Sequence, residues 1–166
     1  MVQELSPSLP PRLALVTGGL NLGGATTFLC NLGGELVRRG VPAEVLSFEK
    51  ENPLAADFKR RKVPVFWQDD RHVIFEDRIR AVLQELRRFR PTTVVSCLGA
   101  ISFEVLRYLP VGVFRVGMVH TEHPREYASV RSYAAQLDLM AGVSKVVKEA
   151  LVAMPEFAHM PVRYLP

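Results

Sequence analysis

Apolar residues along the chain follow two patterns that alternate: short unbroken runs and longer stretches with helical spacing. The short runs, rich in residues that favour strands, predict strands over 13–16, 43–48, 63–67, 92–97, 114–119, 137–143 and 162–165. The longer stretches predict helices over 25–39, 52–58, 74–89, 99–109, 125–136 and 145–154. Such alternation is typical of an α/β fold. It predicts a doubly wound, mainly parallel sheet of about seven strands with helices on both faces, Rossmann-like in type.

The length and composition of the chain are those of one globular domain. A chain of 166 residues can bury a substantial core, and 48% apolar with 23% charged residues is typical of globular proteins. Pro7, Pro10 and Pro11 favour an irregular lead-in over residues 1–11, because proline can neither continue a helix nor donate to a ladder. We therefore expect a single domain over residues 12–166.

Four glycines, Gly18, Gly19, Gly23 and Gly24, separate the first predicted strand from the first helix. Bare backbone amides at a helix N-terminus form an anion site, and glycine lets a ligand approach them closely. The spacing does not match the dinucleotide fingerprint, and Ala25 stands where a P-loop needs its lysine. The alternative is that the glycines only make a tight turn and let the helix pack on the sheet.

Two other segments follow strands at the same predicted edge of the sheet, residues 97–100 and residues 120–123. In doubly wound sheets ligands bind outside the carboxyl ends of the strands, so this convergence favours a ligand site. His120 directly follows the fifth strand, and we expect it to face the crevice, titrate near neutrality and hydrogen-bond a ligand. The alternative is a histidine that only satisfies a loop carbonyl.

The sequence predicts no metal site and no serine nucleophile. His120 and His123, with Glu122 between them, are too few ligands for zinc, and Pro124 breaks the helix that would hold their spacing. Ser144 precedes the last helix and is interpreted as its N-cap, since no Ser-His-Asp set is evident.

The charge and cysteine content narrow the class of partner and compartment. The net charge is +4, with basic residues spread along helices and no basic run interleaved with aromatics, so nucleic acid is not an expected partner. A weak attraction to anionic lipid headgroups would permit peripheral membrane association. Cys30 and Cys97 lie in apolar segments and are interpreted as core residues of a cytoplasmic protein. No apolar run approaches the ~20 residues of a membrane-spanning helix.

Three stretches together resemble the N-terminal domain of family 4 glycosyltransferases of the GT-B fold. They are GGLNLGGATTFLCNLGGELVRRGVPAEVLSF after the first strand, MVHTEH at the fifth, and LMAGVSKVVKEAL near the end. Their order and spacing carry the resemblance, which extends from Arg12 over nearly the whole chain.

The resemblance implies a retaining hexosyltransferase with two Rossmann-like domains, of which the N-terminal one mainly holds the acceptor and the C-terminal one the nucleotide sugar. Carried over by position, Gly23 and Gly24 would lie near the donor phosphates or sugar. His120 would be the catalytic residue that approaches the transferred sugar, and Ser144 would cap a helix beneath the site. No metal or other cofactor is implied, because cations and helix ends stabilise the charge on the leaving phosphate.

The chain departs from the family pattern at two places. Gly33 and Gly34 fall inside the first helix at about 1 kcal/mol each, and we expect them to allow close packing on the sheet. At Pro166 the family usually continues into the donor-binding domain, whose basic pair and two glutamates are absent from this sequence. We therefore expect the N-terminal domain of a larger enzyme, inactive alone, whose partners are the nucleotide sugar, the absent domain and a glycan, lipid or other acceptor.

The loops over 68–73 and 125–131 are candidates for contact with the acceptor. Two other functions stay open. One is a non-catalytic Rossmann-like module that binds a phosphorylated small molecule. The other is an NAD-dependent enzyme, which lacks its usual fingerprint here.

Overall fold

The computed structural model describes residues 10–69 and 74–165. Residues 1–9 of the predicted lead-in and residues 70–73 of the 68–73 loop lie outside these residues. In the described chain the strands are β1 Leu13–Thr17, β2 Ala43–Ser47, β3 Val65–Trp67, β4 Thr93–Cys97, β5 Phe114–Val119, β6 Leu139–Gly142 and β7 Val162–Tyr164. The α-helices are α1 Gly24–Arg38, α2 Ala55–Arg60, α3 Phe75–Phe89, α4 Ala100–Glu104, α5 Pro124–Ser132 and α6 Lys145–Val152. Short 3-10 turns follow α4, α5 and α6 at Val105–Tyr108, Ala134–Gln136 and Pro155–Phe157.

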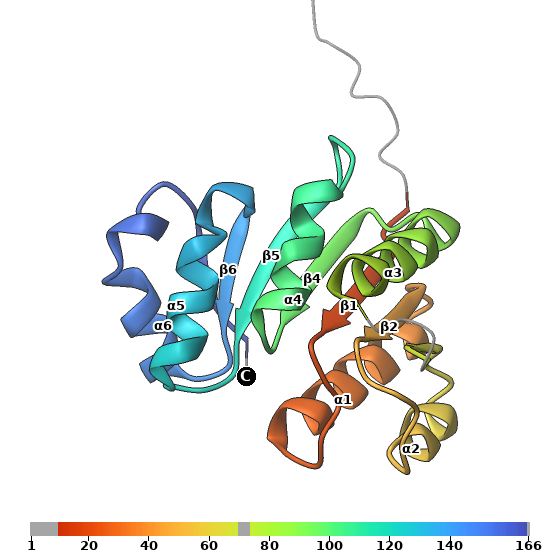
Figure 1. Ribbon diagram of the computed structural model, residues 1–166. Helices are drawn as coiled ribbons and strands as arrows, with labels where there is room; N and C mark the ends of the chain where they lie inside the picture. Colours follow the sequence, from red (N-terminus) through yellow and green to blue (C-terminus); the bar gives the residue numbers. More distant parts are fainter. Residues whose placement is uncertain (1–9, 70–73, 166) are drawn as a thin grey trace, which may run out of the picture.

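The strands form one seven-stranded sheet in the order β3-β2-β1-β4-β5-β6-β7, and every neighbouring pair is parallel (Figure 1). The α/β, doubly wound, Rossmann-like fold predicted from the sequence is therefore confirmed, with a sheet that is wholly parallel. The chain winds outward from β1 to β3, returns through α3 to β4, and then winds the other way to β7. The strand order thus reverses between β1 and β4.

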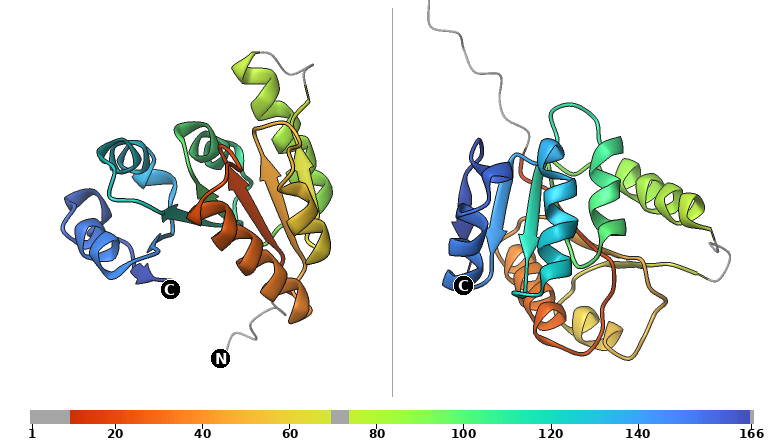
Figure 2. Two further views of the ribbon diagram at one scale, coloured as in Figure 1. Left: turned by 90° about the horizontal axis from the view of Figure 1, so that it is seen from below. Right: turned by 60° about the vertical axis from the view of Figure 1, so that its left-hand side comes forward.

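Helices cover the sheet on both faces, and each face has its own apolar core. Side chains of α1 and α2 pack with Leu15, Val45 and Met118 on one face. Side chains of α3, α4, α5 and α6 pack with Val16 and Val94 on the other face. Figure 2 shows helices on both faces of the sheet. Successive residues of a strand point to opposite faces, and both faces are covered by helices. Each strand is therefore a nearly continuous apolar run in the sequence.

Predicted helix ends agree with the structure where a specific residue ends or caps the helix. Gly40 follows α1 with φ +77°, a left-handed conformation that favours glycine. The Ser144 hydroxyl accepts a hydrogen bond from the Val147 amide at 3.1 Å, so the predicted N-cap of α6 is confirmed. The helix predicted over 125–136 instead stops at Ser132, whose hydroxyl bonds the Ala128 carbonyl and competes with the helical pattern.

The sequence analysis expected Gly33 and Gly34 to allow close packing of α1 on the sheet, but the structure places other residues beside them. A Cβ on Gly33 would lie 3.0 Å from a methyl of Val63, and one on Gly34 would lie 3.1 Å from the side chain of Arg61. Both neighbours belong to the connection between α2 and β3. The two glycines therefore let α1 approach that connection closely.

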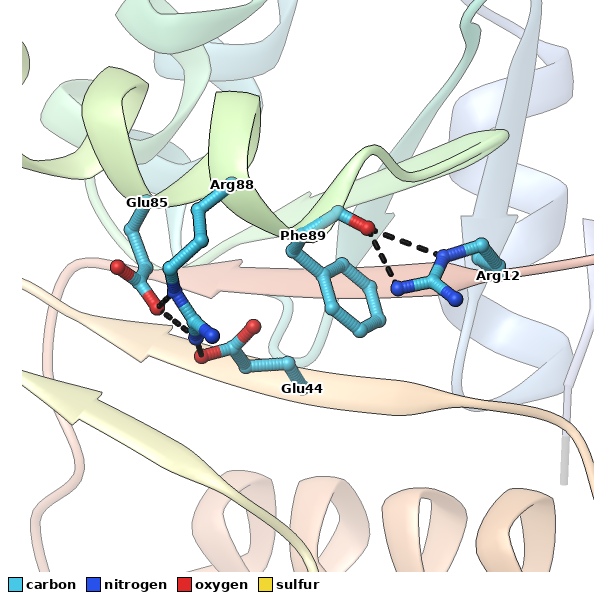
Figure 3. A network of polar contacts seen from close by, with 5 residues as sticks. All are labelled: Arg12, Glu44, Glu85, Arg88 and Phe89. Atoms are coloured by element: carbon cyan, nitrogen blue, oxygen red, sulfur yellow. Dashed lines mark hydrogen bonds and ion pairs between the residues drawn. The ribbon is translucent and has the colours of Figure 1, made fainter.

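The edge of the sheet where β1 and β2 begin carries a polar network (Figure 3). The Arg12 guanidinium donates to the Phe89 carbonyl at 2.7 and 3.0 Å and lies 4.6 Å from the centre of its ring, which ties β1 to the end of α3. Glu44 on β2 points towards α3, where Arg88 lies 3.2 Å from its buried carboxylate. Burial and the neighbouring Glu85 raise the pKa of Glu44 to about 7.

Candidate functional site

A crevice opens where the strand order reverses, between the loops that follow β1 and β4. The helices after these two neighbouring strands, α1 and α4, lie on opposite faces of the sheet, so their loops diverge beyond the point where residues 18 and 98 meet (Figure 2). The crevice holds a cavity of about 510 Å³. Its lining comes from four loops and helix starts: Gly18, Gly19, Asn21, Leu22, Gly23, Gly24, Ala25, Thr26, Glu49, Leu98, Gly99, Ile101, Thr121 and Glu126.

Packing within the protein requires a glycine at position 18. The Gly18 amide donates to the Leu98 carbonyl at 2.7 Å, and a Cβ on Gly18 would lie 2.0 Å from that oxygen. Leu98 itself has φ +56°, a left-handed conformation that is strained for a residue with a branched side chain. Gly18 therefore has a structural role, but a different one from the tight turn or the helix packing considered in the sequence analysis: it allows the close approach of the loops after β1 and β4.

The loop over residues 18–21 uses its polar groups internally. The Glu49 carboxylate, which follows β2, accepts from the Leu20 amide at 2.9 Å and from the Asn21 side-chain amide at 3.3 Å. The Asn52 side chain donates to the Leu20 carbonyl at 3.0 Å. These contacts hold the loop in place and occupy the Leu20 amide, so that amide is not available to an anion.

Gly23 and Gly24 at the start of α1 are open to the cavity. A Cβ added to either would meet no atom within 4 Å, so packing does not require glycine at these positions. No side chain caps α1, and its first turn holds no acidic residue. The first intrahelical hydrogen bond runs from Thr27 to Gly23 at 3.1 Å, which leaves the amides of residues 24–26 at the crevice. This is the geometry of an anion site at a helix N-terminus.

His120 lies at the end of β5, half-buried beside α1. Its ring meets the Phe28 ring edge-on, with 5.4 Å between the centroids. Burial lowers the pKa of His120 to about 4, so the imidazole is neutral at pH 7 and the expectation of titration near neutrality is wrong. Its Nε2 is buried and has no hydrogen-bond partner in the described chain. The neighbouring Thr121 lines the cavity, whereas His120 itself does not.

Glu126 is a site residue that the sequence analysis did not single out, although it lies in the segment 125–131 named there as a candidate for contact with the acceptor, which the structure shows to be part of α5. It lies in the first turn of α5 and lines the cavity. Burial raises the pKa of its carboxyl group, and the nearby His123 partly opposes that shift. Its Oε2 is buried without a hydrogen-bond partner among the described residues. An acidic residue in a first helical turn ordinarily only complements the helix dipole, so the sequence held no signal that separated Glu126 from that role.

The sequence model of Glycosyltransferase Family 4 matches residues 22–166. The chain belongs to Glycosyltransferase Family 4. The match begins at the open start of α1 and continues through the end of the described structure. Family membership assigns the domain to glycosyl transfer. A search of curated proteins found no significant match.

Solved glycosyltransferases share the fold of this family 4 domain. A glycosyltransferase from Rickettsia africae ESF-5 superposes with a TM-score of 0.65 at 12% identity, over 94% of this chain and 43% of that one. Anabaena HepE, solved in complex with UDP-glucose, gives 0.65 at 14% identity, over 92% and 43%. Sucrose-phosphate synthase from Thermosynechococcus elongatus gives 0.59 at 11% identity, over 93% and 88%. The domain thus spans less than half the length of the first two.

Other chemistry-bearing residues of the family 4 domain have structural roles. His123 caps α5, because its Nδ1 accepts from the Arg125 amide at 3.2 Å. Cys30 and Cys97 are buried and unpaired, as predicted, and burial raises the pKa of the Cys97 thiol to about 12. Across residues 10–69 and 74–165, no three His, Cys, Asp or Glu side chains gather in a group able to hold a metal ion. The absence of a metal cofactor stays a prediction.

None of the helices that the structure describes is both long and apolar enough to cross a bilayer.

Proposed function

We propose that this domain is the N-terminal, mainly acceptor-binding half of a retaining hexosyltransferase. In this proposal the enzyme moves a sugar from a nucleotide-sugar donor to a glycan, lipid or other acceptor, and a second domain of the same protein grips the donor. The observation that carries the proposal is the crevice at the reversal of strand order, with the uncapped start of α1 at its rim. The UDP-glucose bound to Anabaena HepE, a protein of similar fold, supports a nucleotide sugar as donor.

The α1 N-terminus would stabilise the leaving group. When the bond between the sugar C1 and the phosphate oxygen breaks, the electron pair stays on the nucleotide diphosphate. The acceptor oxygen bonds C1 on the same face, and its hydroxyl proton passes to the leaving phosphate. The amides of residues 24–26 and the helix dipole would face the negative charge that develops on the leaving phosphate. Gly23 and Gly24 would let the donor come close, because neither carries a side chain into the open space. No metal or other cofactor is needed for this charge stabilisation.

His120 would position the transferred sugar as a neutral group. With a pKa lowered to about 4, the imidazolium form that would act as a general acid is not populated at pH 7. A neutral imidazole can still hydrogen-bond a sugar hydroxyl, and the buried Nε2 would have to turn towards the cavity beside Thr121 to do so. We infer that His120 acts by orientation rather than as a general acid.

The cellular location of the enzyme and its contacts with other molecules are part of the same proposal. We infer that it works in the cytoplasm, and that basic helices allow weak contact with an anionic membrane surface. Nucleic acid has no role in it.

The test is a transfer assay on the natural protein that contains this chain, with a panel of nucleotide sugars and the anomeric configuration of the product read by NMR. We expect transfer with retention. Gly24→Leu, which places a side chain in the open space, should lower kcat/KM for the donor by about tenfold or more. The control Gly34→Ala lies on the same helix away from the cavity and should keep the wild-type value. Binding of a phosphorylated small molecule without any transfer would instead support a non-catalytic module, and tight NAD binding a dehydrogenase.

A further inference from the structure

The crevice carries a charge opposite to that of the whole chain. The chain has a net charge of +4, yet the charged residues in the lining of the cavity are Glu49 and Glu126, and no lysine or arginine of the described residues lines it. Many of the arginines pair with acidic residues on the helix surfaces, as Arg38 does with Glu35 on α1 and Arg131 with Glu156 near α5. The concave surface is therefore the acidic part of a basic domain.

The two carboxylates of the cavity have different surroundings. Glu49 is engaged on both oxygens by the Leu20 amide and the Asn21 side chain, so it holds the loop and adds a fixed negative charge. Glu126 has a buried oxygen without any partner among the described residues. A buried polar atom without a partner is unfavourable, and a ligand that donates a hydrogen bond to it removes that penalty.

The crevice thus presents two kinds of polar group. The start of α1 presents amides and the positive end of the helix dipole. The carboxylates lie at two other places in the lining: Glu49 follows β2, and Glu126 lies on α5 after β5. A phosphate is favoured at the amides, whereas hydroxyl and amino groups, which donate hydrogen bonds, are favoured beside Glu126.

We propose that Glu126 is a specificity-determining residue of the acceptor site, and that it accepts a hydrogen bond from a hydroxyl or amino group of a neutral or cationic glycosyl acceptor. Acceptors with a carboxylate or phosphate beside the reacting hydroxyl are rejected by the two carboxylates of the crevice. This inference rests on the proposed glycosyltransferase function, and it specifies the acceptor that the function leaves open. The cavity of about 510 Å³ is large enough for a sugar ring together with part of a donor.

The test is a titration of the isotopically labelled chain at pH 7.5, in which amide chemical shifts report binding. The three probes are of similar size: methyl α-glucoside, glucosamine and glucuronate. We expect the first two to shift amides at Gly99, Ile101 and Thr121, and glucuronate to bind at least about fivefold more weakly. Glu126→Gln keeps the shape and removes the charge, so the difference between glucoside and glucuronate should shrink. Glu76→Gln, at an exposed position in the first turn of α3, is the matched control and should leave the difference unchanged.

Three results would overturn the inference: glucuronate binding as tightly as the glucoside, an unchanged preference in Glu126→Gln, or no response of the crevice amides to any sugar at millimolar concentration. A well-dispersed spectrum of each variant establishes that it is folded. Failure of the inference is separate from failure of the proposed function, because sugar transfer by the natural protein is measured without reference to acceptor charge.

Discussion

At the scale of single residues, the glycines of the first loop divide into two groups. Gly18 meets the Leu98 carbonyl, whereas Gly24 meets open space. The sequence offers the same residue type at both positions, so it could suggest a ligand site but could not separate the two roles. That separation needs the position of β4, which is 80 residues further on and becomes a neighbour only through the sheet.

This division predicts opposite effects of the same substitution. Gly18→Ala should lower the free energy of unfolding by about 2–4 kcal/mol, because its methyl overlaps a backbone oxygen that cannot move freely. Gly24→Ala should leave stability unchanged or raise it by up to about 1 kcal/mol, because alanine favours the helix and meets nothing. Denaturant unfolding of the two variants measures both values. Equal effects would mean that the two loops do not approach as described.

Glu44 is a second residue that the sequence pattern concealed. Its place inside a strand-forming run indicated only a strand, and its burial against α3 follows from the tertiary structure (Figure 3). Because its pKa is raised to about 7 in the folded protein, folding favours the protonated form. The pKa of Glu85 is lowered, since Arg88 hydrogen-bonds it. The stability that Glu85 contributes is therefore lost only at pH below its ordinary pKa, outside the range in which Glu44 titrates.

Stability should therefore fall as pH rises from about 5 to about 7, with a total loss on the order of 2 kcal/mol from Glu44. Below this window both folded and unfolded forms bind the proton, and above it neither does. Glu44→Gln cannot ionise, so its stability should vary less over the same range. The exposed Glu51→Gln serves as control. Parallel pH profiles of urea unfolding for Glu44→Gln and wild type would contradict the raised pKa.

At the scale of elements, most boundaries could be predicted because they depend on local chemistry. Gly40 and Ser144 end and begin helices through their own backbone or side-chain geometry. The helix predicted over 99–109 is different: only residues 100–104 are α-helical, and a 3-10 turn completes it. Apolar spacing does not distinguish these two helix types over so few residues.

The adjacent glycines of α1 give a prediction at this scale. Gly34→Ala should stabilise the domain by up to about 1 kcal/mol, because helix propensity improves and the flexible Arg61 side chain can move. Gly33→Ala should be less favourable and net destabilising, because its neighbour Val63 is buried and stiff. Thermal unfolding of the two variants gives the comparison. A gain at Gly33 at least as large as at Gly34 would contradict the close contact between α1 and the α2–β3 connection.

At the scale of the whole molecule, the parallel sheet and its crevice could be predicted, since alternation of strands and helices leaves few arrangements. The charge of the crevice could not. Nothing in the sequence around Glu49 or Glu126 distinguishes them from other acidic surface residues. Only the fold brings the two carboxylates to one cavity. His120 was correctly predicted at the carboxyl ends of the strands, but its burial and its neutral state depend on packing against α1.

The central claim is that this family 4 domain is the acceptor-side half of a nucleotide-sugar enzyme and cannot transfer sugar alone. The most direct measurement compares sugar transfer from labelled UDP-glucose and other nucleotide sugars by the isolated chain and by the natural protein that contains it. We predict transfer by the natural protein and none by the isolated chain, even when the chain is folded. Turnover by the isolated chain would contradict the claim, and so would a natural protein that binds but never transfers the sugar.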